Sequence, residues 1–488
     1  MAKGRAAFFW KAVENIVSQF VSLGIFLLLV ALLDPSHFGL FAVVLAINEF
    51  AKIVFENTFT QEIERSPRID STRCSTAYWL TAGVALAVYA VIFAAAPLAD
   101  RLIADGPGAE VVRVAGLAIL AGAAGNVHQS LLRRRLAFRG IAIRSLTAQL
   151  AAGVLAVALA RAGYGVWALV AQIVLAAIVM CVFNWVLARW VPRLRFSRAM
   201  AVELLRFGGT VSTSRLIRIG RIHLLRLLIG SAYGVTLLGT FTVAQRIART
   251  TERVVGLTIG QVSLPYLGRI QGDPAAFHGR LATIFESAAL IAAPILLCLA
   301  VLASPAIAFL FDDVWLPAAA FLPPLCVIAF TEILLGLVGI APKAQGRPRT
   351  EAAIWFSTLV VDLGTVGAFL LAGGDLVAAI WTVAALRVLL LAGALVVVRK
   401  AVSLDGGDLM RRAWAPIAAS VAIYLAYRWA SADMATPGPI AMALHGTAIL
   451  AVYAAAVGLL DNRLARRFVG TVRPRARTPA AGTGMPGR

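Results

Sequence analysis

The chain has 488 residues, of which 60% are hydrophobic and only 14% are charged. Soluble domains carry roughly a quarter charged residues, so this composition excludes an ordinary water-soluble protein. The formal net charge of +21 would on its own suggest a nucleic-acid-binding protein, but its distribution, described below, argues against one. The four cysteines are scattered without ligand or disulfide spacing, so we expect no metal and no cofactor.

The hydropathy pattern predicts an all-α integral membrane protein with about fourteen transmembrane helices, because each crossing needs about 20 apolar residues. The first apolar run resembles a signal peptide, but no small-residue cleavage site follows it, so we interpret it as a membrane helix. In chain order, the expected spans are 15–33, 38–60, 76–96, 110–131, 141–160, 165–188, 204–229, 233–260, 281–303, 316–340, 352–372, 376–398, 413–430 and 440–460.

Basic residues alternate between the loops that join these spans. One set of loops and both chain ends together hold 32 Lys and Arg residues, whereas the other set holds only Arg101 and Arg161. The positive-inside rule therefore places both termini in the cytoplasm of a bacterium, with the chain in its inner membrane. Tryptophans near the predicted span ends suggest an interfacial belt: Trp79, Trp167, Trp190, Trp315, Trp355, Trp414 and Trp429.

Two stretches of the chain, near 15–60 and 204–250, have the same pattern of a long helix, a short turn with glycine, and a helix that carries charge. Both copies start on the cytoplasmic side, so we expect two parallel six-helix lobes around a central cavity, plus two C-terminal helices. The expected domains are an N-terminal lobe (1–190), a C-terminal lobe (200–400), two extra helices (401–460) and a basic disordered tail (461–488).

Three predicted spans, 38–60, 204–229 and 233–260, each contain three or more charged residues. Each arginine at the centre of a helix costs about 2.5–3.5 kcal/mol if it faces lipid, so these side chains should face a polar cavity or a partner. The acidic residues available inside the membrane are too few to neutralise them, which predicts a net cationic cavity suited to an anion. The candidate binding residues are Arg215, Arg218, Arg221, Arg226, Arg246, Arg249, Glu49 and Lys52.

Several short motifs resemble the Wzx-type oligosaccharide flippase family of the multidrug/oligosaccharidyl-lipid/polysaccharide exporter superfamily, nearest to its colanic acid and succinoglycan exporter branch. The motifs lie in order over roughly residues 15–400. They are Leu33-Asp34-Pro35-Ser36-His37-Phe38-Gly39-Leu40, Leu132-Arg133-Arg134-Arg135-Leu136-Ala137-Phe138-Arg139, Gly163-Tyr164-Gly165-Val166-Trp167-Ala168-Leu169, Arg206-Phe207-Gly208, Leu228-Ile229-Gly230, Gly239-Thr240-Phe241-Thr242-Val243-Ala244-Gln245-Arg246 and Gly346-Arg347-Pro348.

The resemblance implies a flippase that moves undecaprenyl-diphosphate-linked oligosaccharide units to the periplasmic leaflet for exopolysaccharide or O-antigen synthesis. Its expected partners are this lipid-linked substrate, membrane lipids, and a polymerase and chain-length regulator of the same pathway, but no nucleic acid. Arginine forks match phosphate oxygens, so we expect Arg215, Arg218 and Arg246 to hold the diphosphate, with Arg221 and Arg249 as secondary contacts. Glu49 and Lys52 would line the other lobe.

One position departs from the family pattern: Leu225 stands where an acidic residue is frequent, which weakens any carry-over of a cation-coupling site. Three alternative functions stay open. A drug or cation antiporter of the same superfamily would need an acidic cavity. A flippase for peptidoglycan precursors would have the same fold and the same transport mechanism as an oligosaccharide flippase. A membrane polymerase or ligase would need a larger periplasmic loop than this chain offers, so we do not expect an enzyme.

Overall fold

The computed structural model describes residues 17–55, 63, 70–102, 107–209, 213–270, 273–345, 347–402, 405–430 and 438–461. All the regular structure in these residues is helical. The predicted basic tail after Asp461 lies outside the described residues.

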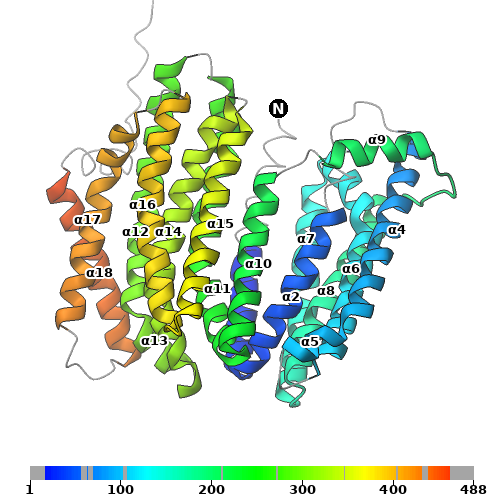
Figure 1. Cartoon of the computed structure of the whole chain (residues 1–488), viewed down its shortest axis with the longest axis horizontal. Coiled ribbons are helices and arrows are strands. Elements are labelled where there is room, and N and C mark those ends of the chain that lie inside the picture. Colours follow the sequence, from blue (N-terminus) through cyan, green and yellow to red (C-terminus); the bar gives the residue numbers. More distant parts are fainter. Residues whose placement is uncertain are drawn as a thin grey trace, which may run out of the picture.

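The N-terminal lobe contains six long helices within the described residues (Figure 1). The first covers Val17–Val30. It is followed by α2 (Pro35–Phe55), α4 (Ser71–Ala95), α6 (Gly108–Arg134), α7 (Phe138–Arg161) and α8 (Val166–Ala188), with the short α5 (Pro97–Leu102) between α4 and α6. The turn between α7 and α8 reverses the chain through Gly163 and Gly165, both at positive φ, a conformation that glycine adopts without strain.

The C-terminal lobe repeats this architecture with six long helices. They are α10 (Thr213–Tyr233), α11 (Val235–Arg269), α12 (Pro274–Val301), α14 (Leu316–Ala344), α15 (Pro348–Leu371) and α16 (Leu376–Val402). The short helices α13 (Ala303–Leu310) and η1 (Asp313–Trp315) precede α14, and two further long helices, α17 (Gly406–Ala430) and α18 (Pro439–Leu460), pack against α12. The prediction of fourteen helices in two six-helix lobes plus two is therefore confirmed.

One predicted boundary was wrong. The seventh span was expected to begin at residue 204, but residues 204–209 belong to α9 (Arg198–Gly209), which lies across the end of the N-terminal bundle (Figure 1). The apolar residues of α9 suggested the start of a membrane helix. They instead form one face of an amphipathic helix, with Ala201 and Leu204 buried and Val202 and Glu203 exposed.

Nine helices in the described part of the chain are long and apolar enough to cross a membrane by composition alone. The sequence analysis singled out charges on α2, α10 and α11, and of these helices α10 and α11 are excluded from the nine because each carries three or more charged residues in its described part. These same three helices join the lobes, since α2 packs against both α10 and α11. The charged helices thus lie at the contact between the lobes and are not scattered over the lipid-facing surface.

A close backbone contact between the lobes is made by two glycines at equivalent positions of the repeat. A Cβ atom on Gly39 would lie 1.8 Å from the carbonyl oxygen of Val235, and a Cβ on Gly239 would lie 1.8 Å from that of Pro35. Each glycine is four residues after the first residue of its helix, α2 or α11. The reciprocal pattern indicates a pseudo-twofold axis between the two helices, as expected for parallel repeats.

The tryptophan belt was predicted correctly only in part. Trp79, Trp414 and Trp429 are exposed, as residues at a membrane interface should be. Trp315 and Trp355 are buried inside the C-terminal lobe instead, where Trp315 packs edge-on against Phe38 of the N-terminal lobe. Proximity to a span end therefore did not distinguish an interfacial tryptophan from one that packs between helices.

Candidate functional site

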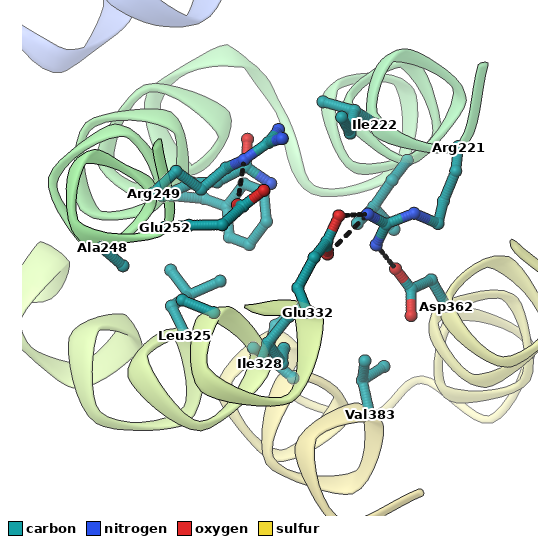
Figure 2. A pocket seen from close by; sticks show the side chains of 15 residues that line it. Arg221, Ile222, Ala248, Arg249, Glu252, Leu325, Ile328, Glu332, Asp362 and Val383 are labelled. Atoms are coloured by element: carbon teal, nitrogen blue, oxygen red, sulfur yellow. Dashed lines mark hydrogen bonds and ion pairs between the residues drawn. The ribbon is translucent and has the colours of Figure 1, made fainter. Parts of the chain in front are cut away.

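A network of four buried charged residues lies in the C-terminal lobe. Arg221 donates from Nη1 to Asp362 Oδ2 at 2.6 Å and from Nη2 to both carboxylate oxygens of Glu332 at 2.6 and 2.7 Å (Figure 2). Arg387, whose side chain is 0% exposed, donates from Nε and Nη2 to the two oxygens of Asp362, both at 2.8 Å. Two arginines and two carboxylates balance in charge, and they link α10, α14, α15 and α16.

A small cavity of about 30 Å³ lies beside this network. Its polar wall includes Arg249, which donates from Nε to Glu252 Oε2 at 3.1 Å, and Figure 2 shows this pair opposite Glu332. Leu325, Ile328 and other apolar side chains form the remaining wall. Every lining residue belongs to the C-terminal lobe, so this cavity is not the space between the lobes that the sequence predicted.

The remaining arginines of α10 and α11 form a second group. Six arginines of these helices have described side chains, and no carboxylate of the described residues forms an ion pair with four of them: Arg218, Arg226, Arg246 and Arg253. Arg226 is buried and donates from Nε and Nη2 to Gln245 Oε1 at 3.1 and 2.7 Å. It lies within electrostatic range of Arg246 and Arg253, so the group concentrates positive charge that no ion pair among the described residues neutralises.

Arg246 reaches from one lobe to the other. Its Nη2 donates to Ser22 Oγ at 2.9 Å, and its guanidinium carbon stands 4.2 Å from the centre of the Phe26 ring. Both partners lie on the first helix of the N-terminal lobe. Arg218 is exposed, with its guanidinium 5.4 Å from the centre of the Trp355 ring. Both guanidinium groups thus rest on aromatic faces, which leaves their N–H groups available for further acceptors.

The structure places the other predicted residues as follows. Lys52 donates to Glu49 at 2.8 Å on α2, and neither lines the cavity beside Arg221. Arg221 and Arg249 both have carboxylate partners, and their role as secondary contacts to an anion stays a prediction. The side chain of Arg215 lies outside the described residues.

Two buried arginines were missed by the sequence analysis. Arg387 is the lone arginine in the apolar run 376–398, and its isolation was the signal that could have marked it as paired. Arg144 was counted as part of a basic loop, but α7 begins at Phe138 and buries it, with Nη1 donating to Asn184 Oδ1 at 2.7 Å.

Comparison with known proteins identifies the family. The sequence profile of the family described as polysaccharide biosynthesis protein matches residues 28–320, more than half of the chain. The chain belongs to this family. Proteins with similar sequences include the succinoglycan biosynthesis transport protein ExoT of Rhizobium meliloti (strain 1021), 26% identical over 93% of this chain and 92% of that protein. The lipopolysaccharide biosynthesis protein WzxC of Escherichia coli (strain K12) is 22% identical over 69% of each chain.

Solved structures agree on the fold of this polysaccharide biosynthesis protein. The lipid II flippase MurJ in an inward closed conformation superposes with a TM-score of 0.72 at 12% identity, covering 94% of this chain and 99% of that one. An inward-facing multidrug transporter of the MATE family superposes with a TM-score of 0.57 at 17% identity, covering 80% and 98%. The chain is thus a multi-pass membrane protein with the fold of these two solved structures.

Proposed function

We propose that this protein is a flippase for undecaprenyl-diphosphate-linked oligosaccharide units, with no enzymatic step of its own. The observation that carries the proposal is the group of arginines on α10 and α11 that no carboxylate of the described residues pairs with, next to the contact between the lobes. A diphosphate concentrates negative charge on oxygens that arginine forks bind well. A drug or cation antiporter would instead need an acidic group at this place.

In this proposal the diphosphate binds between the lobes at Arg218 and Arg246, with Arg226 adding positive charge behind them. Arg215 stays a proposed contact on its position alone, two positions after the start of α10. Arg221 is assigned a structural role, because both ends of its guanidinium are held by carboxylates. Glu49 and Lys52 would line the N-terminal side of the path, and the polyprenyl tail would stay in lipid.

The direction of transport follows from the proposed orientation. With both termini and the basic loops in the cytoplasm of a bacterial inner membrane, the N-terminal ends of α2 and α11 lie on the periplasmic side. The close contact at Gly39 and Gly239 then closes the periplasmic side, so substrate enters from the cytoplasmic leaflet. The names of the relatives ExoT and WzxC support a place in polysaccharide export, where a polymerase and a chain-length regulator would act on the product.

We expect Arg246→Gln to slow transport by about tenfold or more, because a hydrogen bond to a charged group contributes roughly 1.5–3 kcal/mol. Arg246→Lys should keep part of the activity, since it retains the charge but loses the fork. The measurement uses proteoliposomes with lipid-linked oligosaccharide and follows its exposure to a membrane-impermeant lectin. Arg399→Gln, an exposed arginine at the end of α16, is the matched control.

The double variant Arg218→Gln/Arg246→Gln extends this test. Full transport by the double variant, at an unchanged melting temperature, contradicts the assignment of the diphosphate to these residues. Recovery of a chemically altered oligosaccharide from the wild-type vesicles would contradict the absence of an enzymatic step.

A further inference from the structure

The segment that connects the two lobes, residues 189–204, is fixed to the N-terminal lobe along its backbone. We refer to it as the interlobe strap. The Arg193 amide donates to Ser75 Oγ at 3.1 Å, and the Ser197 amide donates to Thr76 Oγ1 at 3.1 Å. The indole N–H of Trp79 donates to the carbonyl oxygen of Arg193 at 2.9 Å. Each anchor residue lies on the first turns of α4, so the strap has a defined position at this end of the bundle.

Seven side chains between residues 189 and 198 of the strap are exposed on the side away from this support. Three apolar residues are largely exposed: Leu194 at 91%, Val191 at 69% and Phe196 at 57%. They alternate with four exposed arginines, Arg189, Arg193, Arg195 and Arg198. The only acidic residue of the strap is Glu203, which is paired with Arg73 at 2.7 Å, and no carboxylate of the described residues pairs with these four arginines. The strap thus presents apolar and cationic side chains that no other described residue covers.

The position of the strap indicates what covers it. It crosses the ends of α4, α6 and α8, where the transmembrane helices leave the apolar part of the membrane, and α9 continues across the same end (Figure 1). At this depth apolar side chains can enter the acyl chains while arginines reach the phosphates. A soluble acidic partner would match the arginines but would leave Leu194 and Phe196 without an apolar environment.

We propose that the interlobe strap is a binding site for anionic phospholipids of the adjoining leaflet. The phosphate groups are held by Arg193, Arg195 and Arg198, and the acyl region receives Leu194 and Phe196. This site is separate from the proposed diphosphate site, and it does not depend on which lipid-linked sugar is transported. Because the strap is the covalent link between the lobes, bound lipid holds the linked end of the N-terminal lobe at the membrane surface while the C-terminal lobe moves.

The experiment measures retention of phosphatidylglycerol by the full-length protein. Protein in nanodiscs of phosphatidylcholine with increasing phosphatidylglycerol is extracted, and retained lipid is counted by native mass spectrometry. Each arginine near an anionic surface contributes about fivefold in affinity. The triple variant Arg193→Gln/Arg195→Gln/Arg198→Gln should therefore bind phosphatidylglycerol at least about tenfold more weakly than the wild type. The matched control removes the same charge from exposed arginines of α15, α16 and α17: Arg349→Gln/Arg399→Gln/Arg411→Gln.

A second variant, Leu194→Ser/Phe196→Ser, tests the apolar part without changing the charge. Weaker retention in both strap variants, with the control unchanged, supports the site. Equal retention in the strap variants and the control overturns it. Loss of added polyprenyl-diphosphate-linked sugar from the triple variant, with phosphatidylglycerol retained, also overturns it, because the strap would then hold the transported lipid.

Discussion

Replacing Asp362 with alanine is expected to destabilise the C-terminal lobe more than any other single change considered for this protein. Asp362 accepts two hydrogen bonds from Arg387 and one from Arg221, and all three side chains are buried. Removing one partner of a buried ion pair costs about 3–5 kcal/mol, because the remaining charge is left without compensation. We expect Asp362→Ala to lower the melting temperature and the yield of detergent-purified protein, as measured by fluorescence-detected size-exclusion chromatography after heating.

A double variant separates the loss of charge balance from the loss of volume. Asp362→Leu/Arg387→Met removes one acid together with the base that donates two hydrogen bonds to it, while Arg221 keeps both bonds to Glu332. Buried ion pairs replaced by apolar groups of similar volume are often neutral in stability, so this protein should regain most of its melting temperature. Asp312→Ala is the matched control, since Asp312 is exposed and its side chain makes no capping bond. If the double variant melts as early as Asp362→Ala, the charge explanation is wrong.

The ion-pair network of Arg221 shows which features could be predicted from the sequence and which could not. Runs of about 20 apolar residues and the alternation of basic loops were sufficient to predict fourteen helices, because both patterns are local. The pairing of Arg221 with Glu332 and Asp362 is not local: the residues are 111 and 141 positions apart. The sequence predicted that arginines of α10 would need a cavity or a partner. Only the packing of α14, α15 and α16 determines which of them has the partner.

The distribution of partners also changes the interpretation of the charged helices. The arginines whose acidic partners come from α14 and α15 lie inside the C-terminal lobe, whereas Arg246 contacts Ser22 and Phe26 of the other lobe. A single stripe of charge in the sequence thus separates into a neutral structural group and a cationic group near the lobe contact. The second group is the one proposed above to bind the diphosphate, and it is smaller than the set of eight residues predicted from sequence.

A second large effect is expected from Gly239→Ala. The added Cβ would lie 1.8 Å from the carbonyl oxygen of Pro35, and that atom belongs to backbone and cannot rotate away. The N-terminal ends of α2 and α11 must therefore separate before alanine fits. We expect transport to fall sharply, and we expect spin labels at Tyr164→Cys and Ala372→Cys, near the same end of each lobe, to move apart in double electron–electron resonance on a background without native cysteines.

Gly39→Ala should give the same result, because its Cβ would meet the Val235 carbonyl oxygen in the reciprocal contact. Gly364→Ala is the matched control, since nothing lies within 4 Å of the added atom, and alanine in place of glycine within a helix stabilises by up to about 1 kcal/mol. An unchanged label distance in the first two variants would mean that the helices adjust locally and that this contact does not control the separation of the lobes. A longer label distance in both Gly39→Ala and Gly239→Ala, with Gly364→Ala unchanged, would mean that the lobes can close on this side of the membrane because these two glycines lack a Cβ atom.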